Sequence, residues 1–264
     1  MRFFANHDLH VHTNLSSCAR DHGASPQELV DFAEKNGYDT ICITNHMWDS
    51  TVPGASEWYL PQNMEHIMED LPLPKSASVR VLFGCETEFC GGRQLAIRPA
   101  CFNRVDFVVI PPNHFHLTAP PDCDNIAKAA ELFTTRLEEL IALPLPWHKI
   151  GIAHLTTKLT YEDPPNAHFG VYALMPEARL MPVFRFLAQQ GAGIELNAGC
   201  FRPGWRDFYE ENLKLYRIAK EAGCKFYCCS DAHSIPALSG VKTNLSEVID
   251  ILGLSAADRY IVPL

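Results

Sequence analysis

The sequence predicts an α/β fold built on parallel strands, arranged as an open sheet or a barrel. Short apolar runs alternate along the 264 residues with longer helical patterns, which is typical of this class. No repeat, low-complexity tract or linker rich in Pro, Gly or Ser divides the chain. Because a chain of this length can bury one large core, we expect a single domain that spans residues 1–264.

Seven runs of β-branched, aromatic and other apolar residues are the predicted strands. They lie within residues 3–12, 38–46, 79–88, 105–116, 149–155, 192–197 and 224–233. Each run ends in a residue that can bind a metal or hold a polar substrate. Parallel strands of a sheet or barrel present their carboxyl ends at one face, so we expect these residues to meet in one pocket.

The clearest predicted helix begins near Ser25 and ends near Gly37. Ser25 is a suitable N-cap, Pro26 fits the first helical position, and Glu28 can close a capping box. Gly37 can adopt the left-handed conformation that ends a helix. Further helical patterns cover residues 125–143, 176–190, 208–221 and 246–252, with a short helix near 63–70. We expect loop structure over most of residues 47–78 and over residues 156–175.

The composition indicates a globular protein of a reducing compartment, with 47% hydrophobic and 20% charged residues. The net charge of −9 disfavours a nucleic-acid partner, although bound divalent cations would offset it locally. The ten cysteines show no CxxC pair and no disulfide framework. We expect buried thiols in a cytoplasmic protein, since residues 1–12 lack a signal-peptide core and no run is long enough to span a membrane.

Histidines and carboxylates follow the predicted strands. His10 and His12 point to the same side of an extended strand because side chains alternate, and Asp231 and His233 repeat this spacing. Imidazole and carboxylate ligands suit Zn, Mn or Fe, and the two oxygens of Glu86 can bridge two ions. The full candidate set is His10, His12, His46, Glu86, His114, His154, Asp231 and His233, with His22 added from the first loop.

Each of these residues also has a purely structural interpretation. A single histidine after a strand is most often structural or solvent-exposed, and one HxH pair occurs easily by chance. Eight such residues at one face are different, because a buried cluster of unpaired polar groups is costly without a metal. The pattern therefore predicts a metal centre at the carboxyl ends of the strands.

The motifs DLHVHT, ITNH, FGCETEF, NHFH, GIAHL, IELN and SDAH, in this order and spacing, resemble those of the PHP (polymerase and histidinol phosphatase) superfamily. The resemblance extends from Asp8 to the last helix. It implies a single distorted (β/α)7 TIM-like barrel that holds three divalent metal ions, two of them bridged by Glu86. The implied ligand sets are His10, His12, Glu86 and Asp231; then Glu86, His114 and His154; and then His22, His46 and His233.

The sequence departs from the family pattern at three places, and two of these departures leave alternatives open. Asn45 stands where the family usually has Asp, so one carboxylate is missing. The loop after His12 is longer than usual, and the segment PPNHFH has one additional residue. The competing residues are Cys18, Asp21 and His22 for the loop ligand, and His114 and His116 for the histidine of PPNHFH. We favour His22, because the residues that follow it run directly into the first helix, and we interpret Cys18 as a structural bystander.

The resemblance implies a hydrolase that acts on phosphoric ester bonds. Two bridged ions lower the pKa of a shared water, and the resulting hydroxide can attack phosphorus. Arg202 is the best candidate to clamp the phosphate, and Asn197 is a candidate substrate contact, although each can also be an ordinary loop residue. Asp231 is a candidate proton donor to the leaving group. We expect a small-molecule phosphomonoester as the substrate, with histidinol phosphate as the specific prediction.

Two other functions remain open at this stage. A phosphodiesterase or exonuclease that acts on nucleotides is disfavoured by the acidic balance and by the lack of a basic run. A non-catalytic, metal-binding regulatory domain is disfavoured because the ligand motifs are intact. The sequence does not indicate the oligomeric state.

Overall fold

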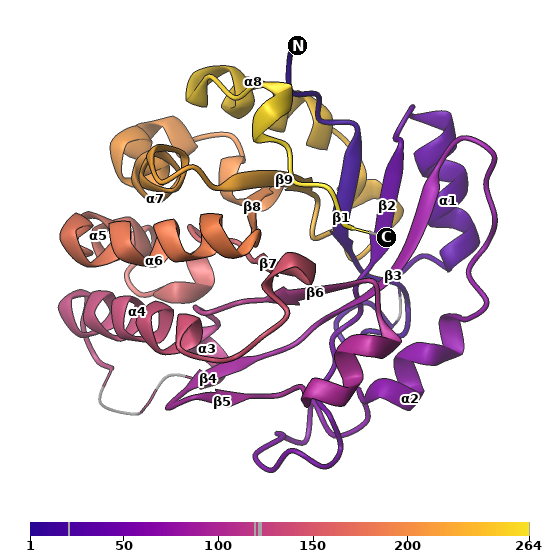
Figure 1. The fold of residues 1–264 in the computed structure, drawn as a ribbon, viewed down its shortest axis with the longest axis horizontal. Helices are drawn as coiled ribbons and strands as arrows, with labels where there is room; N and C mark the ends of the chain where they lie inside the picture. The colour runs from indigo at the N-terminus through magenta and orange to yellow at the C-terminus, as the bar shows by residue number, and fades with distance from the viewer. Residues whose placement is uncertain (21, 119, 121–122, 264) are drawn as a thin grey trace.

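Seven parallel strands curl around a common axis and form a nearly closed barrel (Figure 1). This computed structural model describes residues 1–20, 22–118, 120 and 123–263. Backbone hydrogen bonds from His12 to Ala232 (3.0 Å) and from Asp231 to His10 (2.8 Å) join the first and last strands. The strand order is β1 (His7–Val11), β2 (Thr40–Ile43), β3 (Arg80–Glu86), β6 (Phe107–Ile110), β7 (Ile150–Ile152), β8 (Gly193–Asn197) and β9 (Lys225–Cys229). The predicted α/β class and the barrel that the resemblance implied are both confirmed.

The helices pack against the outside of the strands. In Figure 1, α4, α5, α6 and α7 are stacked on one side of the barrel, and α1 lies on the other side. No helix in the described ranges is long and apolar enough to cross a membrane. The long helices are α1 (Pro26–Lys35), α4 (Ile126–Ile141), α6 (Glu177–Gln190), α7 (Tyr209–Glu221) and α8 (Val241–Leu252). The smaller elements are α2 (Met64–Ile67), α3 (Phe115–Thr118), α5 (Ala167–Leu174), β4 (Phe89–Gly91) and β5 (Gln94–Leu95).

Side chains alternate along each strand between the helices and the barrel interior. On β8, Ile194 and Leu196 belong to the core beneath the helices, whereas Glu195 points the other way, toward His10. Gly151 is required in the interior, because a Cβ at this position would overlap the rings of Tyr227 and Phe107. The apolar interior cluster contains Leu9, Cys42, Leu82, Phe107, Val109, Ala153, Tyr227, Cys229, Tyr260 and Val262. The polar side chains collect at the carboxyl end of the strands, beyond this apolar layer.

The first helix forms as its sequence predicts. The side chain of Ser25 accepts a hydrogen bond from the backbone of Glu28, and the Glu28 carboxylate accepts one from the backbone of Ser25 at 2.8 Å. Asn36 ends the helix, and Gly37 follows it with φ of 64°. A side chain other than glycine would be strained at that φ.

Two predicted boundaries differ from the structure. The segment 156–175 was expected to be loop, but it contains α5, whose Phe169, Val171 and Tyr172 are buried in the core beneath the neighbouring helices. Their burial stabilises this helix, although the Pro, Asn and Asp residues of the segment favour a loop. The last helix begins at Val241, earlier than the predicted 246, directly after Gly240. None of the ten cysteines, all of which lie in the described ranges, forms a disulfide; six are buried, and Cys18 is exposed.

Candidate metal centre

Two histidines and two carboxylates converge where β1, β3 and β9 end. The Nε2 atoms of His10 and His12 lie 3.1 Å apart. Glu86 Oε2 lies 3.3 Å from the first of these atoms and 3.5 Å from the second. Asp231 Oδ1 lies 3.6 Å from His10 Nε2 and 3.3 Å from His12 Nε2. Zinc bonds of about 2.0–2.1 Å at tetrahedral angles place neighbouring ligand atoms roughly 3.3 Å apart, so these spacings match the edges of a coordination shell.

The other oxygen of Glu86 faces a second pair of histidines. Glu86 Oε1 lies 3.2 Å from His154 Nε2 and 3.8 Å from His114 Nε2. These two Nε2 atoms are 3.1 Å apart, and the rings are stacked. Glu86 is only 1% exposed and stands between two groups of imidazoles, which is the arrangement that a bridging carboxylate needs.

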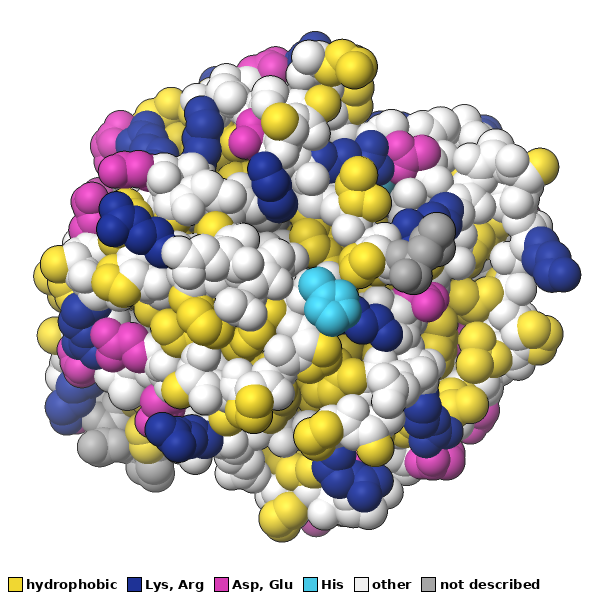
Figure 2. All heavy atoms as spheres, in the orientation of Figure 1, with side chains coloured by type: hydrophobic (Ala, Val, Ile, Leu, Met, Phe, Trp, Pro, Cys, Tyr) yellow, Lys and Arg dark blue, Asp and Glu magenta, His cyan; other side chains and the backbone are white. Residues whose placement is uncertain are grey.

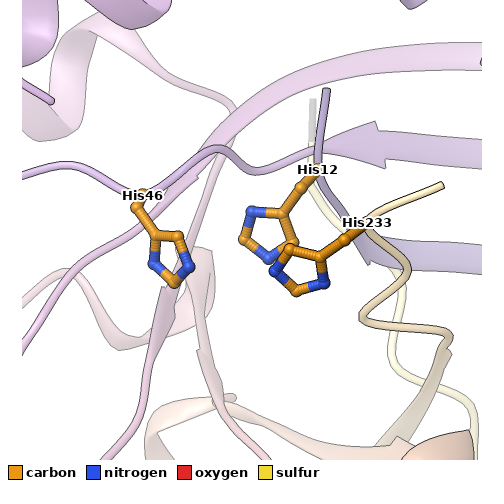
Figure 3. A group of neighbouring side chains, drawn as sticks. All are labelled: His12, His46 and His233. Atoms are coloured by element: carbon orange, nitrogen blue, oxygen red, sulfur yellow. The ribbon is translucent and has the colours of Figure 1, made fainter. Parts of the chain in front are cut away.

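A third group of histidines lies beside the first. The rings of His12, His46 and His233 come from three separate segments and face one another (Figure 3). The His12 ring stacks on His46 with centroids 4.6 Å apart, and on His233 at 4.3 Å. Cys18 of the first loop lines one cavity together with His46 and His233. Burial alone would raise the pKa of the Cys18 thiol, but its contacts with the two histidines lower this pKa to about 7.

Most of the clustered imidazoles are oriented by a second contact through their other nitrogen. His10 Nδ1 donates to Glu195 at 2.8 Å, and His114 Nδ1 donates to Glu88 at 2.6 Å. His12 Nδ1 contacts the Ser16 hydroxyl at 3.0 Å. A partner on Nδ1 sets the tautomer and presents Nε2 to the centre, as is usual for metal-binding histidines.

Burial and charge oppose each other throughout the cluster. Burial favours a neutral Glu86, but the neighbouring His46 and His10 hold the pKa of its carboxyl group well below the ordinary value. Burial likewise disfavours a charged His46, but Glu86 outweighs burial and raises the pKa of the imidazole to about 10. At His12, burial dominates, and the nearby His233 and His46 lower its pKa further. The buried carboxylates therefore demand positive charge, which protonated histidines supply in the metal-free chain.

A second, independent observation also indicates that this set of donor atoms suits divalent cations. His46 Nδ1 and Glu86 Oε2 lie 2.9 Å apart, yet both are buried atoms without a hydrogen bond. Imidazole nitrogens and carboxylate oxygens are the donors that zinc, manganese and iron accept. Buried polar atoms without a hydrogen bond are costly, and cations shared among them would remove this cost.

Two residues of the cluster adopt unusual backbone conformations. His154 has φ of 21° and Asp231 has φ of 52°, in the region that side chains other than glycine rarely occupy. Each follows a strand directly and turns its side chain toward the centre. Such strain persists where the surrounding structure imposes it, and it occurs most often at functional sites.

The structure brings together eight of the nine residues predicted as metal ligands. They are His10, His12, His46, Glu86, His114, His154, Asp231 and His233. His22 is exposed and belongs to none of the groups formed by the described residues, so the structure differs here from the sequence-based choice. Its rival Asp21 lies outside the described residues. The other rival, Cys18, lines the same cavity as His46 and His233.

The alternative between His114 and His116 is resolved by their positions. His114 is buried against Glu88 and His154, whereas His116 is exposed and contacts the edge of the His114 ring at 5.4 Å. Asn45, which stands in place of the usual carboxylate, bonds Ser16 and Asp70 and so anchors the first loop.

A cavity of about 440 Å³ opens beside the cluster. Asp231 lines this cavity and also the smaller cavity that His46 and His233 line. Arg202 lines the larger cavity from an exposed position and forms no ion pair with the described residues. Asn197 is 2% exposed, and its amide donates to Glu195 at 3.0 Å and to Asp231 Oδ2 at 3.3 Å. Asn197 therefore orients a carboxylate of the cluster and also lines the cavity.

Glu195 and Glu88 are the members of the site that sequence reasoning missed. Glu195 is fully buried and accepts hydrogen bonds from His10, from the backbone of His154 and from the Tyr227 hydroxyl. The available signal was spacing: Glu88 stands two residues after Glu86, as His12 follows His10, and therefore shares its side of the chain.

Comparisons with known proteins agree with this geometry. A model of the PHP domain matches residues 8–199. A histidinol phosphate phosphatase from Lactococcus lactis subsp. lactis, solved with zinc, L-histidinol and phosphate, has a TM-score of 0.63 at 18% identity, covering 96% of this chain and 95% of that one. For a putative histidinol phosphatase from Listeria monocytogenes the TM-score is 0.60 at 13% identity, covering 88% and 97%. No curated protein matched the sequence. The chain belongs to the PHP domain family.

Proposed function

We propose that this protein is a metal-dependent phosphoesterase that hydrolyses a small-molecule phosphomonoester, with histidinol phosphate as the specific substrate. The observation that carries the proposal is the pair of donor groups that share Glu86, next to a cavity of about 440 Å³. In the proposed centre one cation is held by His10, His12, Glu86 and Asp231, and a second by Glu86, His114 and His154. Divalent cations bound there supply an activated water and neutralise charge on the phosphoryl group.

Residues of the cavity supply the remaining functions of the proposed mechanism. Arg202 has no ion-pair partner among the described residues, so its guanidinium is available to bind two phosphate oxygens. The neighbouring Lys158, which lies 3.9 Å from Glu162, adds a second positive charge. The stacked rings of Phe169 and Phe208 form an apolar wall that suits the organic part of a substrate.

We assign Asp231 the role of a proton acceptor for the attacking water. Burial would raise the pKa of its carboxyl group, but His10 and His12 lower it far below the ordinary value. An ionised carboxylate first accepts a proton, and the protonated carboxyl can then donate it to the leaving group, which is the role expected from sequence. Asn197 holds Oδ2 of Asp231 and thereby leaves Oδ1 toward His10 and His12.

The test is phosphate release by the purified full chain, supplied in turn with Zn²⁺, Mn²⁺ and Fe²⁺. We expect release from histidinol phosphate at a higher kcat/KM than from p-nitrophenyl phosphate. Glu86→Gln should lower kcat by at least about a hundredfold, because the bridging charge is lost. Arg202→Ala should raise KM, whereas Arg206→Ala, a surface residue paired with Glu247, should leave both constants unchanged. Absence of phosphate release from every phosphomonoester would refute the proposal.

A nuclease that acts on single strands is the alternative within the same family. The face shown in Figure 2 has Lys and Arg side chains interspersed with Asp and Glu, and the net charge is −9. A surface of this kind disfavours binding of the negatively charged backbone of a nucleic acid. An assay on labelled single-stranded DNA and RNA, with the same metal-loaded protein, distinguishes the two activities. We further propose a cytoplasmic location, in keeping with ten cysteines that form no disulfide in the described part of the chain.

A further inference from the structure

His46 and His233, at the edge of the cluster, offer a cation only two ligands, which is one fewer than a zinc site needs. His12 is the third ring of the group, but both of its nitrogens are already engaged. Its Nδ1 contacts Ser16, and its Nε2 faces His10, Glu86 and Asp231. A cation between His46 and His233 therefore requires a donor from elsewhere.

The nitrogens of His46 and His233 are arranged to receive such a cation. His233 Nδ1 donates to the backbone carbonyl of Asp231 at 3.0 Å, which leaves Nε2 as the free acceptor. His46 is 7% exposed, and its Nδ1 is buried without a hydrogen bond. Both rings line one cavity of about 330 Å³, together with Glu86 and Asp231. A buried nitrogen without a hydrogen bond, in a polar cavity, is a position where a cation relieves a cost.

Cys18 completes the set from the first loop. Its thiol lines the same cavity as His46 and His233, and its interaction with them lowers the pKa of the thiol and raises the pKa of both imidazoles. A thiol that shares a cavity with two imidazoles can supply the third ligand to a cation between them. His22, which stands four residues later, is exposed and lines none of the described cavities.

We propose that Cys18, His46 and His233 form a thiolate–imidazole site for a zinc-class cation, at the mouth of the proposed centre. The inference deepens the proposed function, on which it rests for the identity of the neighbouring cations. A soft thiolate ligand favours Zn²⁺ over Mn²⁺, whereas the neighbouring groups, with imidazole and carboxylate donors only, accept either. The site therefore restricts the choice of metal at one position and leaves the other positions permissive.

The experiment replaces zinc with Co²⁺, whose bond to a thiolate gives a sulfur-to-cobalt charge-transfer band in the near ultraviolet. The full chain is stripped with a chelator under reducing conditions, titrated with Co²⁺ and followed by absorbance, and its zinc content is measured after reloading. The variants are Cys18→Ser and His22→Gln, and the matched control is Cys90→Ser, a half-buried thiol outside the cluster. Circular dichroism verifies that each variant is folded.

We expect the charge-transfer band in the wild type, in His22→Gln and in Cys90→Ser, and its loss in Cys18→Ser. Zinc content should fall by one ion per chain in Cys18→Ser, and the site's zinc affinity by at least about tenfold. No band in the wild type, or an unchanged band in Cys18→Ser, would overturn the proposal. Loss of the band and of one zinc ion in His22→Gln would restore the ligand expected from sequence. A Cys18-dependent band in a chain that releases no phosphate would refute the proposed function and leave this site intact.

Discussion

Replacing Glu195 by Gln tests whether the buried carboxylate behind His10 controls metal binding. The carboxylate accepts four hydrogen bonds: Oε2 accepts from His10 Nδ1 and the Tyr227 hydroxyl, and Oε1 accepts from the backbone N–H of His154 and the side-chain amide of Asn197. Glutamine has one carbonyl oxygen and one NH2 group in place of the two carboxylate oxygens. The two N–H or O–H donors that now bond one of these oxygens would therefore face the NH2 group, which is itself a donor. If the carbonyl keeps the Oε1 pair, the new NH2 group faces His10.

His10 can relieve that conflict only by moving its proton. With Nδ1 as the acceptor, Nε2 carries the hydrogen and can no longer bind a cation. Loss of such a supporting carboxylate costs roughly 10–100-fold in metal affinity, or about 1.4–2.8 kcal/mol. The metal-free chain also loses one hydrogen bond to a charged acceptor, which is worth about 1.5–3 kcal/mol.

The assay is competition for Zn²⁺ with a chromophoric chelator, combined with thermal unfolding of the metal-free chain. Tyr227→Phe is the matched control, because it removes a donor to the same oxygen and leaves the His10 contact in place. We expect a weaker zinc affinity in Glu195→Gln and little change in Tyr227→Phe. Equal zinc affinity of Glu195→Gln and wild type would refute the role assigned to Glu195.

Three further predictions concern the stability of the metal-free chain. His7 is buried, and its burial, followed by the charge of Arg259, lowers its pKa from 6.5 to about 3. Between these two pH values the unfolded chain binds more protons at His7 than the folded chain does. The contribution of His7 to the free energy of unfolding should therefore fall by about 2 kcal/mol from pH 7 to pH 5. Urea unfolding should show this difference between the wild type and His7→Gln, and parallel pH profiles would contradict it. Gly151→Ala should cost about 1–3 kcal/mol in urea unfolding, because the Cβ overlaps Tyr227 and Phe107. Ser25→Ala should cost about 1 kcal/mol, measured in the same way, through loss of the helix cap.

Local patterns in the sequence were sufficient for the strands and for most of the metal centre. Spacings of two residues, as in His10 and His12, place both side chains on one side of an extended segment whatever its neighbours are. The cap at Ser25 is equally local, because its hydrogen bonds join residues three apart. Parallel strands then bring their ends together, which is why Glu86 and Asp231 were expected to meet.

Only the tertiary structure shows that Cys18 of the first loop lies at the cavity of the cluster and that His22 lies away from it. That loop is held by contacts with distant segments: Ser16 bonds Asn45, the backbone of Ser17 bonds Gln62, and the carbonyl of Leu15 contacts His66. These contacts place Cys18 beside the histidines and leave His22 exposed. Loop conformation depends on such long-range partners, and no periodicity within the loop records them.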